Sequence, residues 1–351
     1  MRVLLLGSNG YLGRHVADRL LADPAVQLVV LGREDAADVR FDLASGSPGA
    51  LSRFLDAVHP SVVVNCAGTT RGGTRELTRQ NIVAVATVCE AMRRSDCGAR
   101  LVHLGCSAEY GPSPLGSSTL EETLPRPGGP YGVSKLAATE LVLASGLDAV
   151  VLRVFSPVGP GTPAGSPLGR LAEAMRRAMQ AGESELRVAG LGVQRDFVDV
   201  RDVARAVHAA SLSAAKGVIN IGTGRAVRIR EAAAVLARVA GFGGAVHDVE
   251  TASQRGGAPL AVAAAQAQAG ILAARQPGSA AVPIPAQGAA PGAAGAEQSP
   301  APPALAHPHP DGCGNWQQAD VRTARERLGW RAGTALEESL ADIWMEAACR
   351  I

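Results

Sequence analysis

The architecture of the chain follows from a stretch near its start, Val3-Leu4-Leu5-Leu6-Gly7-Ser8-Asn9-Gly10-Tyr11-Leu12-Gly13. The apolar run is typical of a buried strand, and the residues after the glycines show the spacing of an amphipathic helix. Backbone N–H groups at the start of a helix bind phosphate when no side chain blocks them, which is what glycines allow. The G-x-x-G-x-x-G spacing therefore predicts a strand–turn–helix that binds a dinucleotide, with contacts from Gly7, Asn9, Gly10, Tyr11, Leu12 and Gly13.

Apolar runs of the same kind recur along the first 157 residues, with helical patterns between them. The runs cover 28–31, 62–65, 101–104 and 149–154, and the helical patterns cover 12–21, 51–58, 81–92 and 134–144. Strands that are apolar throughout, separated by amphipathic helices, indicate a parallel sheet with both faces covered. Because crossovers in such sheets are right-handed, we predict a doubly wound α/β sheet of the Rossmann type.

The rest of the chain is less regular. We expect helices at 168–180, 203–212, 231–240, 320–328 and 336–347, a strand at 218–221 and a charged turn at 194–199. The predicted domains are a dinucleotide-binding domain over 1–157, with return strands near 189–221, and a smaller substrate-binding lobe formed by 158–251 and 315–351. Residues 252–314 are rich in Ala, Pro and Gly, which predicts a disordered insertion.

Composition excludes several classes of protein. The 34 Lys+Arg and 32 Asp+Glu nearly balance, and no basic cluster predicts nucleic-acid binding. Prolines interrupt the longest uncharged stretch, so no membrane span is expected. The six cysteines form no CxxC pair, which favours free thiols in a reducing cytoplasm. No metal site is expected, because His307, His309 and Cys313 lack a fourth ligand.

The residue after the second strand distinguishes between the two nicotinamide cofactors. An acidic residue there binds the ribose 2′-hydroxyl of NAD, whereas an arginine accommodates the 2′-phosphate of NADP. Arg33 is the first charged residue at this point, which favours NADP(H) over NAD(H). The alternative is that Arg33 is a solvated loop residue and that Glu34 or Asp35 lies at the ribose. Asp42 is placed to accept from the adenine amine, or to cap a turn.

Tyr131 and Lys135 lie four residues apart and therefore on one face of a helix. A neighbouring ammonium stabilises the phenolate and lowers the phenol pKa toward neutral pH, where it can exchange a proton with a carbonyl oxygen. The spacing alone is common. After a dinucleotide turn and an apolar strand that leads to Ser107, it predicts a catalytic pair.

At this point the sequence resembles a known family, the extended short-chain dehydrogenase/reductases, which are NAD(P)-dependent nucleotide-sugar epimerases, dehydratases and reductases. The resemblance covers most of the chain outside 252–314. It rests on the glycine turn, on the Tyr-x-x-x-Lys pair and on further motifs: Asp42-Leu43, Asn65-Cys66-Ala67-Gly68, Asn81, Ser107-Ala108-Glu109-Tyr110-Gly111, Arg153-Val154-Phe155-Ser156, Arg195-Asp196-Phe197 and Leu328-Gly329-Trp330.

The resemblance implies a role for each matching residue. Tyr131 is the acid/base, and Lys135 lowers its pKa and binds the nicotinamide ribose. A side chain near the end of the fourth strand, Ser107 or Cys106, polarises the substrate oxygen. Further cofactor contacts are implied for Leu43, Cys66, Ala67, Gly68, Asn81 and Phe155, and substrate contacts for Glu109, Ser156 and Arg195. Relatives often form homodimers, which makes a homodimer an expectation by analogy.

Two positions depart from the family pattern. The hydroxyl that usually lies four residues before the Tyr of the Tyr-Gly pair is replaced by Cys106, with Ser107 beside it. A thiol is a weak hydrogen-bond donor, and adjacent residues on a strand point to opposite faces. Either Ser107 or a water substitutes for the hydroxyl, or activity is reduced. Ser156 stands where many members have Asn, which leaves that substrate contact open.

These features predict an enzyme that moves hydride between NADP(H) and a sugar carbon. The Ala108-Glu109 pair supplies one carboxylate where a dehydratase needs two. We therefore favour the reduction of a nucleotide-activated 4-keto-6-deoxyhexose, with Tyr131 as the proton donor. A nucleotide-sugar 4-epimerase or dehydratase that recycles its cofactor is the alternative. From another class, a non-catalytic NAD(P)-binding sensor would explain Cys106.

Overall fold

The computed structural model describes residues 1–249 and 314–350, which belong to one compact unit. The predicted insertion, apart from Gly314, lies outside the described residues, as do His307, His309 and Cys313. Among the helices that are described, none has the length and apolar character needed to cross a membrane.

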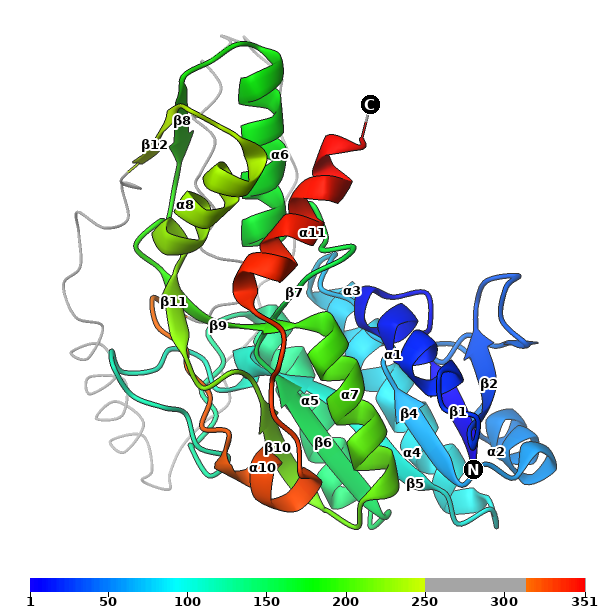
Figure 1. Ribbon diagram of the computed structural model, residues 1–351. Helices are drawn as coiled ribbons and strands as arrows, with labels where there is room; N and C mark the ends of the chain where they lie inside the picture. Colours follow the sequence, from blue (N-terminus) through cyan, green and yellow to red (C-terminus); the bar gives the residue numbers. More distant parts are fainter. Residues whose placement is uncertain (250–313, 351) are drawn as a thin grey trace, which may run out of the picture. The chain divides into compact units, whose positions relative to one another are not determined.

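A seven-stranded sheet forms the centre of the fold, and all of its strands run parallel. This confirms the predicted doubly wound α/β fold, and each apolar run of the first 157 residues lies within one of the strands. The strand order is β10-β6-β5-β4-β1-β2-β3 (Figure 1). The strands are β1 (Arg2–Leu6), β2 (Gln27–Gly32), β3 (Val39–Arg40), β4 (Val62–Asn65), β5 (Arg100–Cys106), β6 (Ala149–Val154) and β10 (Gly217–Ile221).

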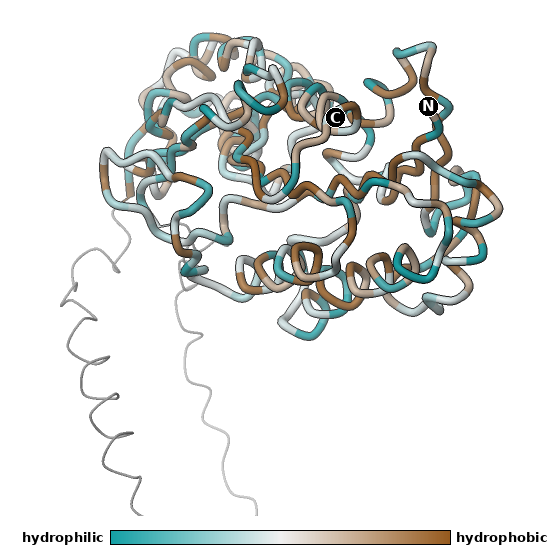
Figure 2. The backbone as a smooth tube through the Cα atoms, turned by 90° about the horizontal axis from the view of Figure 1, so that it is seen from below, coloured by the Kyte–Doolittle hydropathy of each residue, from teal (hydrophilic) through white to brown (hydrophobic). Residues whose placement is uncertain are grey.

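Helices cover both faces of this sheet because successive strand residues point to opposite sides. Leu5 packs with residues of α1 (Tyr11–Leu21) and α7 (Val200–Leu212), together with Ala324 of α10 (Arg322–Leu328). Leu4 packs on the opposite side, with residues of α2 (Pro48–Val58), α4 (Ala84–Arg94) and α5 (Pro130–Ala144). In Figure 2 hydrophobic stretches run through the middle of the molecule, whereas hydrophobic and hydrophilic residues alternate around the helical turns.

A separate hydrophobic cluster lies among the elements that follow β6. Its helices are α6 (Pro167–Gln180), α8 (Ile229–Ala240) and α11 (Leu336–Ala348). Two small sheets accompany them, with orders β11-β9-β7 and β12-β8. Their strands are β7 (Ser156–Val158), β8 (Glu185–Val188), β9 (Gln194–Asp199), β11 (Ala226–Arg228) and β12 (Ala245–Asp248).

The charged turn expected at 194–199 was a wrong prediction, because these residues form β9. Its charged side chains Arg195, Asp196 and Asp199 are buried. Burial of charge is tolerated where each group has hydrogen-bond partners. Asp196, for example, accepts from the backbone N–H groups of Thr223, Gly224 and Ala319. These partners lie far away in the sequence, so the charged pattern resembled a solvent-exposed turn.

Candidate active site

The turn between β1 and α1 can be formed only by glycine at two of its positions. Gly7 has a φ of +78°, and a Cβ there would lie 2.6 Å from the Ala67 nitrogen. A Cβ at Gly13 would overlap the Gly7 carbonyl oxygen. Gly10 is the N-cap of α1, and no side chain caps the helix. The first N–H groups of α1 therefore remain available, and the turn fits the pyrophosphate of a dinucleotide.

The residues expected to contact the adenosine follow the ends of β2 and β3. Arg33 is exposed directly after β2, and Asp35 forms an ion pair with Arg40 at 2.8 Å. Asp42 has turn-capping contacts, because its carboxylate accepts from the Ala44 nitrogen at 3.0 Å and from the Ser45 hydroxyl at 2.8 Å. Its contact with adenine stays a prediction. The neighbouring Leu43 is buried.

The loop after β4 contains three further predicted cofactor residues, Cys66, Ala67 and Gly68. Burial raises the pKa of the Cys66 thiol to about 12, so it is protonated at neutral pH. Asn81 closes this loop from η1 (Thr78–Val83), a π-helical turn: it accepts from the Thr69 nitrogen at 2.8 Å and donates to the Thr69 carbonyl at 2.9 Å. Single π-helical turns are frequent at functional sites.

Tyr131 and Lys135 lie in the first turns of α5, beside the carboxyl end of β5. Lys135 is buried and donates to the Leu104 carbonyl at 2.6 Å. Burial lowers the pKa of Lys135, and nearby Glu109 acts in the opposite direction. A Cβ at Gly132 would lie 2.5 Å from the Ala108 carbonyl oxygen, so α5 packs directly on the turn that follows β5.

This turn separates the two candidate side chains beside the phenol. Cys106 ends β5, and a hydrogen bond joins it to Tyr131. Burial raises the pKa of the Cys106 thiol, which therefore stays protonated at neutral pH. Ser107 is directed elsewhere, because its hydroxyl donates to Gln317 Oε1 at 3.0 Å. The residue in contact with the predicted acid/base is thus the cysteine.

The side chain of Glu109 is buried beneath the turn that follows β5 and does not reach the surface. It has no exposed area, accepts from the Cys106 nitrogen at 2.7 Å and forms an ion pair with Arg153 at 2.6 Å. Burial raises the pKa of Glu109, while Arg153 and Lys135 lower it. A direct contact with substrate would require this turn to move, so in this conformation Glu109 orients the backbone at Cys106.

The remaining predicted residues follow β6 or lie on β9. Phe155 is 1% exposed and packs near the Tyr110 ring, with centroids 6.4 Å apart. Ser156 begins β7 and is partly exposed. Arg195 is 1% exposed and donates to the carbonyls of Gln194 and Gly314 at 2.9 and 2.7 Å. Its side chain thus lies under the segment that begins at Gly314.

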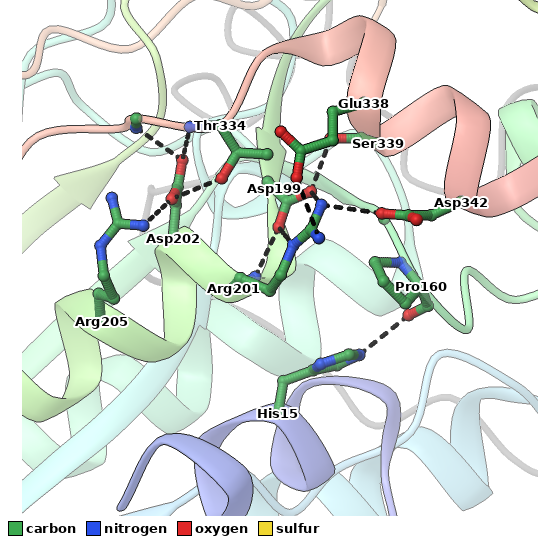
Figure 3. A network of polar contacts seen from close by, with 12 residues as sticks. His15, Pro160, Asp199, Arg201, Asp202, Arg205, Thr334, Glu338, Ser339 and Asp342 are labelled. Atoms are coloured by element: carbon green, nitrogen blue, oxygen red, sulfur yellow. Dashed lines mark hydrogen bonds and ion pairs between the residues drawn. The ribbon is translucent and has the colours of Figure 1, made fainter. Parts of the chain in front are cut away.

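The loop after β7 contacts the first helix of the dinucleotide turn. The Tyr11 hydroxyl lies 3.0 Å from Thr162 Oγ1, and Arg14 donates to the Gly161 carbonyl at 2.9 Å. His15 lies 2.9 Å from the Pro160 carbonyl oxygen (Figure 3). Burial raises the pKa of the Tyr11 phenol, so it stays protonated. These contacts fix the position of the predicted cofactor residue Tyr11.

Two residues of the site were missed by reasoning from the sequence. Ser134 accepts from Asn81 Nδ2 at 2.9 Å and donates to the Tyr131 carbonyl at 2.8 Å, which links the β4 loop to α5. Its place inside the Tyr-x-x-x-Lys motif was a usable signal. Gln317 gave no such signal, because it lies 210 positions from the serine that it contacts.

Two features lie at the carboxyl edge of the sheet: a glycine turn after β1 that fits a pyrophosphate, and a tyrosine and a lysine on one helix beside β5. This is the arrangement of an NAD(P)-dependent enzyme of the extended short-chain dehydrogenase/reductase type. A family model agrees with this class: that of the NAD dependent epimerase/dehydratase family matches residues 3–222. The chain belongs to this family, which confirms the resemblance noted from the sequence.

Individual relatives are similar over most of the chain. A dTDP-6-deoxy-L-talose 4-dehydrogenase (NAD(P)(+)) from Kitasatospora kifunensis is 33% identical over 359 residues, covering 98% of this chain and 94% of that protein. A GDP-6-deoxy-D-mannose reductase from Pseudomonas aeruginosa is 28% identical, covering 68% and 80%. The structure of RMD from Pseudomonas aeruginosa complexed with NADPH has the same fold, with a TM-score of 0.72 at 20% identity and coverage of 100% and 99%.

Proposed function

We propose that the protein reduces the C4 carbonyl of a nucleotide-activated 4-keto-6-deoxyhexose with NADPH. The observation that supports this most directly is the position of Tyr131, partly exposed at the start of α5 and hydrogen-bonded to Cys106. The names of the two relatives agree with it. One is a 6-deoxy-talose 4-dehydrogenase, whose reaction in reverse is a 4-keto reduction, and the other is a 6-deoxy-mannose reductase.

In this proposal the protein binds the cofactor and the substrate and supplies one proton. The glycine turn and the start of α1 bind the pyrophosphate, and bound NADPH supplies the hydride that adds to the sugar C4. Tyr131 donates its phenolic proton to the C4 oxygen, so that the carbonyl becomes a hydroxyl. The buried ammonium of Lys135 stabilises the phenolate that remains, and Cys106 holds the phenol in place.

We further propose that NADP(H) is preferred over NAD(H). Arg33 directly follows β2, where it can pair with a 2′-phosphate, and one of the two alternative carboxylates, Asp35, is already paired with Arg40. Dissociation constants for NADPH and NADH, measured by fluorescence titration, test this part separately. Equal values would contradict it without affecting the proposed reaction. A homodimer and a cytoplasmic location stay predictions.

The reaction is tested by following NADPH absorbance with dTDP- and GDP-linked 4-keto-6-deoxyhexoses. We expect one of them to be reduced, with the 6-deoxyhexose as product. Tyr131→Phe should lower kcat by about 10²- to 10⁴-fold, the usual contribution of a positioned general acid, and leave the Kd for NADPH unchanged. Full activity of this variant would contradict the acid role. Conversion between epimers without net NADPH consumption would indicate an epimerase, and NADPH binding without any turnover a sensor.

A further inference from the structure

The amide of Gln317 makes two hydrogen bonds to Ser107, in the turn at 106–109 that follows β5 and is called the catalytic turn below. Its Oε1 accepts from the Ser107 hydroxyl at 3.0 Å, and its Nε2 donates to the Ser107 carbonyl at 3.0 Å. Gln317 is 1% exposed and Ser107 is 4% exposed. Breaking these two hydrogen bonds in a buried environment costs free energy, because each donor or acceptor would remain without a partner and without access to water.

The backbone of Gln317 is fixed independently of its side chain. Residues 314–321, here called the return segment, lie between the loop before Thr119 and strand β9. The Gln317 nitrogen donates to the Gln194 carbonyl at 3.2 Å, and the Gln318 carbonyl accepts from the Thr119 nitrogen at 2.8 Å. The Trp316 indole donates to the Ser117 carbonyl at 2.7 Å. The amide of Gln317 therefore reaches Ser107 from a well-anchored position.

Ser107 and Cys106 are neighbours, yet their side chains have different partners. Cys106 is extended at the end of β5 and bonds to Tyr131, whereas Ser107 begins a short 3-10 turn and bonds to Gln317. A hydroxyl has one proton to donate, and that of Ser107 is used on Gln317. As long as this bond persists, Ser107 cannot donate to an oxygen beside the phenol.

We propose that Gln317 is a positioning residue for the catalytic turn: it holds Ser107 away from Tyr131 and thereby keeps Cys106 against the phenol. This rests on the proposed function, in which Tyr131 delivers the proton. Gln317 touches none of the reacting atoms and acts through Ser107. The return segment thus contributes to the alignment of the acid, although it lies far from the Tyr-x-x-x-Lys motif in the sequence.

Gln317→Met tests the proposal, because methionine has a similar length and removes both hydrogen bonds. We expect kcat to fall about tenfold while KM for the keto-sugar and Kd for NADPH stay within twofold, since the binding groups are untouched. In a Ser107→Ala background the same substitution should lower kcat by a smaller factor, because the bond between the two side chains is already lost. Gln318→Met is the matched control: its amide donates to the Ser118 hydroxyl at 2.8 Å, away from the turn, and its kinetics should equal the wild type.

A second measurement does not need the substrate. The rate of Cys106 alkylation by iodoacetamide, followed by peptide mass spectrometry, should rise at least threefold in Gln317→Met and stay unchanged in Gln318→Met. A change in this rate without turnover of any nucleotide sugar would refute the proposed reaction while supporting the positioning role. If Gln317→Met does not fold, Ser107→Ala should show the same faster alkylation. The proposal is overturned if a folded Gln317→Met variant has the kcat and the Cys106 alkylation rate of the wild type. If Gln317→Met does not fold, the same result in Ser107→Ala overturns it.

Discussion

The side chain beside Tyr131 is a thiol, and this shapes the chemistry at the level of single residues. Cys106 is hydrogen-bonded to the phenol, and burial raises its pKa, so the neutral thiol is the form present at neutral pH. A thiol donates a weaker hydrogen bond than a hydroxyl. In the proposed reaction Cys106 therefore holds the phenol in place but polarises the substrate carbonyl poorly.

Cys106→Ser should accordingly increase kcat. A serine hydroxyl is a stronger donor at the same position, and one hydrogen bond contributes about 0.5–1.5 kcal/mol, which corresponds to an increase of about two- to tenfold. Steady-state kinetics with the keto-sugar measures the change. Cys349→Ser replaces an exposed thiol near the end of the chain and should leave kcat unaltered. An unchanged kcat in Cys106→Ser would mean that the carbonyl receives its hydrogen bond from another donor.

Among the elements, the β1–α1 turn requires glycine at two of its positions. Gly7 and Gly13 allow the backbone of the turn to lie against itself and against the loop after β4, and this contact leaves the start of α1 uncovered. A side chain at either position would push these segments apart. Cofactor affinity is therefore linked to backbone packing that no side-chain contact can replace.

Gly13→Ala tests this link. The added methyl group would overlap the Gly7 carbonyl oxygen, so the turn must shift, and we expect the Kd for NADPH to rise at least tenfold. Isothermal titration measures the Kd, and circular dichroism verifies the fold. Gly243→Ala serves as the control, because a Cβ there would have nothing within 4 Å. Wild-type affinity in Gly13→Ala would show that the turn is not the pyrophosphate site.

Sequence predicts an element well when its signal is local. The strands of the central sheet have continuous apolar runs such as 62–65, and the helices between them have a clear periodicity, so both were found. Return strands were expected near 189–221, but 194–199 itself was interpreted as a charged turn, because the buried charges of β9 are balanced by partners elsewhere in the chain. The site divides in the same way. Tyr131 and Lys135 share one helix and were predicted together, whereas the contact of Ser107 with Gln317 exists only after folding.

At the scale of the whole molecule, the last helix is tied back to the middle of the chain. The Asp199 carboxylate accepts from the Ser339 hydroxyl of α11 at 2.6 Å and pairs with Arg201 at 2.8 Å. Arg201 also pairs with Glu338 and Asp342 of α11, at 3.2 and 2.9 Å (Figure 3). The loop before α11 is held in a similar way, since Asp202 accepts from the Thr334 hydroxyl at 3.0 Å. These contacts join β9 and the start of α7 to the C-terminal residues.

Stability should therefore depend on the charge of Asp199. Burial alone would raise the pKa of this carboxyl, but hydrogen bonds from Arg201 and Ser339 hold it below its usual value. A depressed pKa in the folded state stabilises the protein above the unfolded-state pKa of about 3.9, and this stabilisation is lost as the pH falls through the folded value. Asp199→Asn should lower the free energy of unfolding by about 2 kcal/mol at pH 7, the range of a charged hydrogen bond.

Urea unfolding between pH 3 and pH 7 measures this dependence. The difference in free energy between wild type and Asp199→Asn should be full at pH 7, begin to shrink below about pH 4 and approach zero at lower pH, because the wild-type carboxyl then becomes protonated. Asp35→Asn is the control: its side chain is 91% exposed, so its ion pair with Arg40 should contribute little at any pH. A difference that stays constant from pH 7 to pH 3 would show that the geometry of the side chain, rather than its charge, holds α11 in place.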